Sequence, residues 1–146
     1  QNWISSTYTD LNLFIDSPDA LYRSPDSTIN KLTFISSNKN LEINLITKPI
    51  DENLDLSNEL INDFKERNFI NVITKNEDFQ TLDGDKGVKI FGSFDDQNLN
   101  RKKDYSTILF VVNKLSIKLE IIYERGNANL QKIVDRVINS LKFNKQ

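Results

Sequence analysis

A pattern of apolar residues near the end of the chain limits the possible folds more than any other feature of the sequence. Large apolar side chains recur at positions i, i+3, i+4, i+7, i+8 and i+11: Leu130, Ile133, Val134, Val137, Ile138 and Leu141. This spacing predicts a helix with one continuous apolar face. Burying six such side chains contributes on the order of 10 kcal/mol before the entropy of ordering is subtracted. The helix therefore needs a broad apolar surface to pack on, and we expect Phe143 to close over the core at its end.

Two segments just upstream have the pattern of paired β-strands. Residues 105–113 are apolar on both sides at their middle, which predicts a central strand covered on both faces. Residues 115–123 alternate, with Leu115, Ile117, Leu119 and Ile121 on one side and Ser116, Lys118 and Glu120 on the other. This period of two predicts a half-buried strand. A tight turn at Asn113-Lys114 would pair the two segments as an antiparallel hairpin.

Further strands are predicted earlier in the chain. They are the segments 11–16, 31–37, 41–48, 71–82 and 88–94, with 18–30 as a surface loop and 83–87 as a turn. Segments 31–37 and 41–48 are close enough in the chain to form a hairpin.

A second helix is predicted over about 56–68. Its apolar stripe consists of Leu56, Leu60 and Phe64. Asp55 or Ser57 can cap its first turn. Its acidic flank, made of Glu59, Asp63 and Glu66, could be a cluster for metal or acid/base chemistry. We favour a solvent-facing flank in which Asp63 pairs with Arg67 at i+4.

The composition excludes several kinds of chemistry. The chain of 146 residues contains no Cys, no His and no Met. Without Cys and His it can form no Ser-His-Asp or Cys-His nucleophile, no zinc site of those ligands and no disulfide. A net charge of −2 and a pI near 5.2 argue against nucleic acid as the partner. The longest strongly apolar run, 108–112, is far too short to span a membrane.

One acidic loop is a candidate for cation binding. Residues 83–87 read DGDKG, but their glycines do not fall where a calcium loop of the EF-hand kind needs its glycine. We therefore predict an Asp-Gly turn, and no metal or other cofactor. The alternative is a weak metal site in which Asp83 and Asp85 gather with Asp95 or Asp96 at one end of the sheet.

Two groups of side chains are candidates for binding a partner. Trp3 and Tyr8 precede the first expected strand, where they either anchor a partner or pin the chain end onto the domain. Arg101, Lys102 and Lys103 form the one basic cluster of the chain. Because acidic residues flank this cluster on both sides, we interpret it as a solvated loop, with a phosphate or lipid-headgroup patch as the alternative.

Three stretches of the chain are typical of one superfamily: LNLFIDSP at 11–18, TLDGDKGVKIFGSF at 81–94 and IVDRVINSLKF at 133–143. On these motifs the chain resembles the Mog1/PsbP-like superfamily, and in particular its exported bacterial PsbP-like or DcrB-like branch. The resemblance implies an α+β fold, an α/β/α sandwich with a central antiparallel sheet of about six to seven strands, one mid-chain helix and a C-terminal amphipathic helix. We expect residues 1–146 to form one such domain, with 1–10 as a loosely packed N-terminal segment.

The resemblance also implies a binding or assembly role, because the superfamily shares no catalytic residues. Its members include photosystem subunits, a nuclear transport factor, exported bacterial lipoproteins and chaperones of secreted toxins. We expect a non-enzymatic accessory protein, exported to the bacterial periplasm or cell surface, that binds another protein or an envelope component. The absence of Cys suits an oxidising compartment, and Gln1 in place of Met is what removal of a signal peptide would leave, although a chain trimmed in another way would begin in the same manner.

Three alternatives stay open from the sequence. They are a small-ligand or calcium-binding module, an enzyme that uses carboxylates, Tyr or Lys, and a cytoplasmic chaperone of a secreted effector. We expect no membrane-spanning segment, so any attachment to a membrane would come from an N-terminal signal outside this chain.

Overall fold

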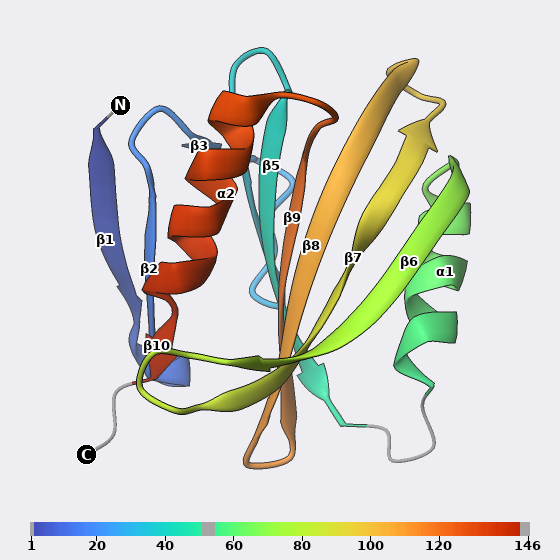
Figure 1. Ribbon diagram of the computed structural model, residues 1–146. Coiled ribbons are helices and arrows are strands. Elements are labelled where there is room, and N and C mark those ends of the chain that lie inside the picture. Colours follow the sequence, from blue (N-terminus) through green and yellow to red (C-terminus); the bar gives the residue numbers. More distant parts are fainter. Residues whose placement is uncertain (1, 51–54, 144–146) are drawn as a thin grey trace.

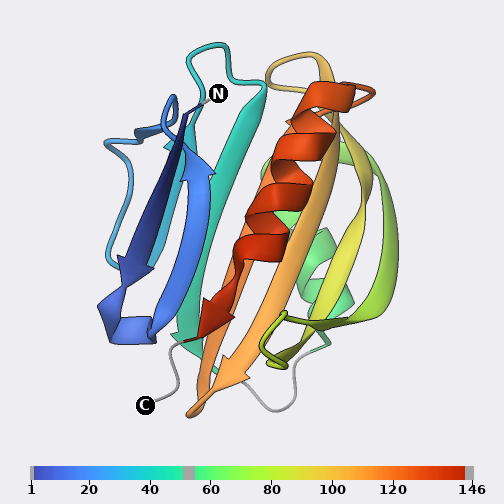
Figure 2. The same ribbon diagram turned by 60° about the vertical axis from the view of Figure 1, so that its left-hand side comes forward.

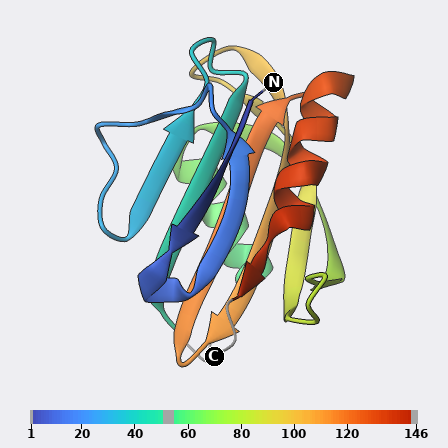
Figure 3. The ribbon, with the colours of Figure 1, turned by 90° about the vertical axis from the view of Figure 1, so that its left-hand side faces the viewer.

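A seven-stranded antiparallel sheet with a layer on each face organises the protein (Figure 1). The computed structural model describes residues 2–50 and 55–143. One helix, α1, covers one face of the sheet, and a second helix, α2, lies on the other face beside a small three-stranded sheet (Figures 2 and 3). Gln1 and the side chain of Leu56 lie outside the described part of the chain.

The elements follow the periodicity of the sequence closely. In spatial order the large sheet contains β3 (Tyr22–Arg23), β4 (Lys31–Ile35), β5 (Leu41–Pro49), β9 (Leu115–Glu124), β8 (Arg101–Val112), β7 (Lys86–Asp96) and β6 (Phe69–Gln80). The small sheet contains β1 (Trp3–Tyr8), β2 (Leu13–Pro18) and β10 (Lys142–Phe143), the helices are α1 (Leu56–Glu66) and α2 (Ala128–Ser140), and a single 3-10 turn, η1, spans Thr9–Leu11. The predicted α+β fold with a central antiparallel sheet is confirmed, while the small second sheet was not expected.

The central strand β9 divides the interior into two cores. Ile117, Leu119 and Ile121 point toward α2 and the small sheet, where they pack with residues such as Val134 and Val137. Ile122 points the other way, into a core beneath α1. That second core is rich in aromatic rings. The ring centroid of Phe64 lies 5.0 Å from that of Phe94 and 4.9 Å from that of Tyr105. The rings of Phe69 and Phe94 stack with their centroids 4.1 Å apart. Both faces of the sheet are therefore buried at its centre.

The C-terminal helix is tied to the small sheet at its end. The side chain of Asn127 caps its first turn by accepting a hydrogen bond from the Leu130 amide at 3.0 Å. At its last residue, Ser140 Oγ accepts a hydrogen bond from the Asp16 amide of β2 at 2.9 Å. Phe143 of β10 then pairs with Leu13 of β2. Its ring contacts the Phe110 ring edge-on, with the ring centroids 4.9 Å apart. The prediction that Phe143 closes over the core is confirmed.

The N-terminal segment forms a strand, so the expectation of a loosely packed 1–10 is wrong for its described residues. β1 pairs with β2 from Trp3 opposite Pro18 to Tyr8 opposite Leu13. The Trp3 ring packs against the α2-side core, and the Arg136 guanidinium of α2 lies 3.9 Å from its centroid. Trp3 therefore pins the chain end onto the fold.

A distortion in β6 depends on one glycine. The register of β6 against β7 shifts between Ile70 and Ile73, and the carbonyl oxygen of Ile73 accepts a hydrogen bond from the Tyr105 hydroxyl at 2.9 Å. The same carbonyl lies over Gly92, where an added Cβ would overlap the oxygen and come within 2.8 Å of the carbonyl carbon. Only glycine leaves room for this crossing.

The residues 2–50 and 55–143 contain no helix that combines the length and the apolar composition needed to cross a membrane.

Gly92→Ala is expected to destabilise the protein by about 3 kcal/mol, because β6 must move away from β7 and break the Tyr105 hydrogen bond. The matched control is Gly126→Ala. Gly126 has a left-handed φ of 78°, which Gly92 does not share, but it has open space around its Cβ position, so that change should cost only about 1 kcal/mol. Urea denaturation of the two variants measures the difference, and equal losses would contradict the steric explanation.

Candidate functional site

The face of the sheet that carries α1 is polar on both sides of the aromatic core. Three of the residues that β9 presents to this face are Ser116, Lys118 and Glu120, which alternate with the apolar residues of the opposite face. α1 covers only the middle of the face, and a cavity lies at each end of the helix. We call these the N-terminal cavity, beside Glu59 and Leu60, and the C-terminal cavity, beside Glu66 and Arg67.

A buried ion pair separates the two cavities. Glu120 is 0% exposed, and its Oε1 accepts hydrogen bonds from Arg67 Nη1 and from Asn44 Nδ2, each at 2.9 Å. Arg67 also pairs with Asp63 at 3.1 Å, as the sequence predicted, and with Glu42 at 3.5 Å. The network joins the end of α1 to β5 and β9, so it fixes where both cavities lie.

The carboxylates keep Arg67 charged despite its burial. Burial alone would lower the pKa of Arg67, but the neighbouring carboxylates of Glu120 and Asp63 outweigh it and raise that pKa. The guanidinium carbon also lies 4.8 Å from the centroid of the Phe69 ring, a favourable cation–π distance.

The C-terminal cavity is open and lined by charges of both signs. Its volume is about 450 Å³. The charged residues that line it are Lys39, Glu42, Glu66, Arg67, Asp96 and Lys103. Asp96 is held by accepting hydrogen bonds from the amides of Asn98 and Leu99. These two amides fix the position of the Asp96 carboxylate at the wall of the cavity.

Lys103 is buried in the wall of this cavity. It is 3% exposed, and its Nζ donates a hydrogen bond to the Lys39 carbonyl at 2.8 Å. Burial lowers the pKa of Lys103, Arg101 lowers it further, and Asp96 opposes the shift. Together with Arg101, which donates to the Asn38 carbonyl at 2.8 Å, Lys103 holds the turn between β4 and β5.

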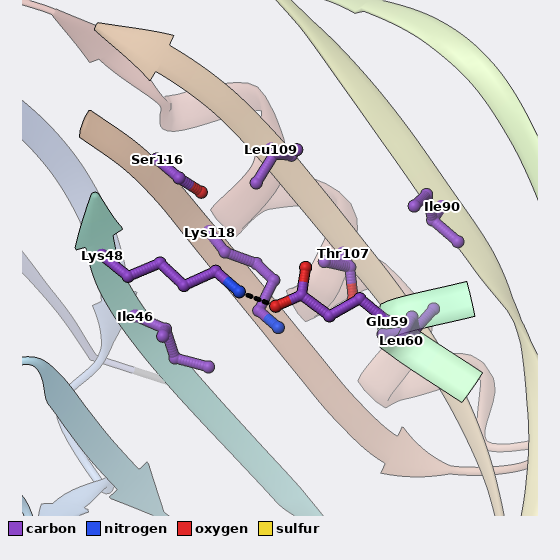
Figure 4. Close-up of a pocket in the computed structure, with 9 residues that line it drawn as sticks. All are labelled: Ile46, Lys48, Glu59, Leu60, Ile90, Thr107, Leu109, Ser116 and Lys118. Atoms are coloured by element: carbon purple, nitrogen blue, oxygen red, sulfur yellow. Dashed lines mark ion pairs between the residues drawn. The ribbon is translucent and has the colours of Figure 1, made fainter. Parts of the chain in front are cut away.

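The N-terminal cavity is smaller and more enclosed (Figure 4). Its volume is about 30 Å³, and its apolar walls are Ile46, Leu60, Ile90 and Leu109. Lys48 of β5 and Glu59 of α1 form an ion pair at this site, and Lys118 of β9 lines the same cavity. Thr107 is 1% exposed, and its hydroxyl has no hydrogen-bond partner among the described residues.

The basic cluster is not the solvated loop expected from the sequence. Arg101, Lys102 and Lys103 are the first residues of β8, where Arg101 pairs with Asp96 and Lys103 with Phe94 of β7. Because side chains alternate in a strand, Arg101 and Lys103 share a face while the exposed Lys102 points away from it. The strand thus divides the cluster.

The four aspartates proposed as a weak metal site do not gather. Asp83 and Asp85 lie at one end of β7 and Asp95 and Asp96 at the other, about 30 Å apart along the strand. The Asn71 side chain donates a hydrogen bond to Asp95 at 2.9 Å and, with Arg125, lowers its pKa. No group of three or more His, Cys, Asp or Glu side chains that could hold a metal ion occurs within 2–50 and 55–143.

Tyr8, the other aromatic candidate, lines a separate cleft of about 380 Å³ between the small sheet and β4–β5. Leu11 and Leu32 line the same cleft. Burial raises the pKa of the Tyr8 hydroxyl, and Arg23 opposes this shift.

Sequence reasoning missed most of the residues around α1. It assigned Lys118 and Glu120 to a solvated face of their strand, although Glu120 is completely buried. One signal was available: the neighbouring segment 105–113 was predicted to be covered on both faces, so the helix over 56–68 had to cover the adjacent strand as well.

Comparison with known proteins identifies the fold only. No protein-family model matches the chain, and no curated protein matches it in sequence. Among solved structures, the Ran-binding protein Mog1p of Saccharomyces cerevisiae is 10% identical with a TM-score of 0.62, over 97% of this chain and 95% of that one. The cyanobacterial PsbP, CyanoP, of Synechocystis sp. PCC 6803 is 9% identical with a TM-score of 0.62, over 97% and 92%.

A third solved structure is LpqN of Mycobacterium tuberculosis, whose description is "involved in cell envelope biogenesis". It is 12% identical with a TM-score of 0.59, over 99% of this chain and 91% of that one. At these identities the likeness establishes the fold and nothing more. It confirms the Mog1/PsbP-like fold that the sequence motifs predicted.

Arg67→Met is expected to cost about 3 to 5 kcal/mol of unfolding free energy, because it leaves the Glu120 carboxylate buried without its cation. Adding Glu120→Leu should recover most of this loss, since the completely buried carboxylate is then gone, the other two carboxylates that pair with Arg67 are partly exposed, and Asn44 keeps its hydrogen bond to Glu42. Asp63→Asn is the control: Asp63 is 41% exposed, so its removal should cost less than about 1 kcal/mol. Urea denaturation measures all four proteins, and a double variant no more stable than Arg67→Met would contradict this explanation.

The lowered pKa of Lys103 predicts a pH dependence of stability. Between this pKa and the ordinary lysine pKa of about 10.4, the unfolded chain binds more protons than the folded one, so the contribution of Lys103 to stability rises with pH through that window. The unfolding free energy of the wild type minus that of Lys103→Met should therefore increase through the window. The control is Lys102→Met, which removes the same charge from an exposed side chain of the same strand. A flat difference for Lys103 would show that burial does not perturb it.

Proposed function

We propose that this protein is a non-enzymatic accessory protein of the bacterial envelope that binds another protein through its C-terminal cavity. The observation that carries the proposal is the cavity itself, about 450 Å³ of open space at the end of α1. Strands and turns from distant parts of the chain form it, and the Arg67–Glu120 pair holds these elements together.

The charges of the cavity fit a polypeptide better than a ligand of one sign. Three cationic and three anionic side chains line it, so no strong net potential attracts a nucleic acid or a free anion. Ile35, Phe69 and the 38% exposed Leu99 add apolar surface between the charges. A mixed polar rim with an apolar contact is the usual composition of a protein–protein interface.

The state of the ionisable groups favours binding over catalysis. Arg67 is bound to Glu120, Asp96 accepts from two amides, and Lys103 donates to a carbonyl. Groups held in this way position a surface, whereas a general acid and base need neighbouring environments that separate their pKa values.

An accessory role in the envelope is supported by the fold and by composition. Mog1p is a Ran-binding protein and LpqN is described as involved in cell envelope biogenesis, so proteins of this fold serve both as binding partners and in the envelope. The absence of Cys from the chain suits a compartment where free thiols oxidise.

Site-specific photo-crosslinking in the native cells tests the proposal. A photoreactive residue at Leu99, on the cavity, should give one discrete protein adduct in the envelope fraction. The same residue at Val111 should not, although Val111 is 60% exposed, because it lies at the opposite end of β8. Charge reversal by Lys39→Glu should weaken the Leu99 adduct. Equal adducts from both positions, or none from Leu99, would rule out binding at this cavity, and an adduct found only in the cytosol would rule out the envelope.

A further inference from the structure

The N-terminal cavity contains a buried hydroxyl that the described residues leave without a partner. Thr107 lies on β8 between Ile90 of β7 and Glu120 of β9, and it is 1% exposed. Its Oγ1 finds no donor or acceptor among the residues described, and Thr107 lines the N-terminal cavity. A buried polar group without a partner costs free energy unless a ligand or water satisfies it.

The charges at this cavity leave one positive charge over. Lys48 and Lys118 contribute two cations and Glu59 one carboxylate, which is paired with Lys48. Lys118 forms no ion pair with any residue of 2–50 or 55–143. Glu120 does not line the cavity, and its Oε1 is bound by Arg67 and Asn44. The excess charge therefore favours a monoanion.

The size and walls of the cavity limit what that anion can be. About 10 to 15 Å³ of such space holds one water molecule, so 30 Å³ admits a group of two or three non-hydrogen atoms. A carboxylate has three. The carboxylate alone therefore fills the cavity, and the alkyl group that carries it extends out of the cavity past its apolar walls, where Ile46 and Leu109 flank Lys118 on the two neighbouring strands.

We propose that the N-terminal cavity binds a terminal carboxylate that follows a short apolar group. One carboxylate oxygen accepts a hydrogen bond from the Thr107 hydroxyl and the other pairs with the Lys118 ammonium. Two sources carry this chemistry, a free short-chain carboxylic acid and the C-terminal residue of a polypeptide. The site lies at the opposite end of α1 from the C-terminal cavity, so it does not depend on the function proposed there.

Titration of the full chain with butyrate, followed by amide NMR, tests the proposal. Saturable shifts are expected at Thr107, Lys118 and Glu59, with a dissociation constant in the millimolar range because the ligand has few atoms. Butyramide has the same shape without the charge and should shift none of them. Equal binding of butyrate and butyramide would overturn the proposal.

Two substitutions separate binding from stability. Thr107→Val and Lys118→Met should each weaken butyrate binding about tenfold. Thr107→Val should leave the melting temperature unchanged or raised, since it removes a hydroxyl that has no protein partner. The matched control is Thr74→Val, because the Thr74 hydroxyl is also buried but does not line the cavity. This control should bind butyrate like the wild type, and equal losses in the two valine variants would contradict the assignment.

Peptides distinguish the two sources of the carboxylate. A short peptide ending in valine with a free carboxylate should compete with butyrate if the ligand is a polypeptide C-terminus, and its amidated form should not. If butyrate binds and neither peptide competes, the ligand is a small acid. If a crystal grown with butyrate contains only an ordered water between Thr107 and the unpaired Oε2 of Glu120, the proposal is wrong and the cavity is a structural water site.

Discussion

The need to cover both faces of β8 and β9 determines how the rest of the chain is arranged. These two strands lie in the middle of the large sheet, so neither face of them can be left to solvent. One face meets the requirement with aliphatic side chains against α2 and the small sheet. The other meets it with an aromatic core under α1 and polar side chains beyond the ends of that helix. The two faces therefore differ in construction: the α2 side is a continuous aliphatic core, and the α1 side leaves a cavity at each end of its helix.

The polar side depends on a single pair of opposite charges. Replacing a buried ion pair by apolar residues is often neutral or stabilising. Arg67 and Glu120 therefore do not give this interface the highest unfolding free energy that it could have. What the pair does is specify position: Arg67 ends α1, Glu120 lies at the centre of β9, and their contact sets the helix over the sheet with space at each end.

The sequence predicted the elements whose side chains repeat with a clear period, and it failed where position depends on distant partners. α2 and the hairpin of β8 and β9 were readable because their apolar residues recur at fixed spacing. β1 was missed because Trp3, Ile4 and Tyr8 do not alternate. The buried Lys103 donates to a backbone carbonyl 64 residues away, and the buried Glu120 accepts from a guanidinium 53 residues away. Neither contact produces a pattern in the sequence around the residue.

The order of the strands has a consequence for how the chain can be made. β5 pairs with β9, which follows it much later in the chain. Within this pairing, Asn44 donates a hydrogen bond to Glu120, 76 residues away. β2 is joined to the end of α2 by a hydrogen bond that spans 124 residues. Contacts this distant form late and slowly, because the ends of a long loop must first meet. During synthesis, β5 therefore waits for β9, and β2 waits for the end of α2, before either can make its native contact.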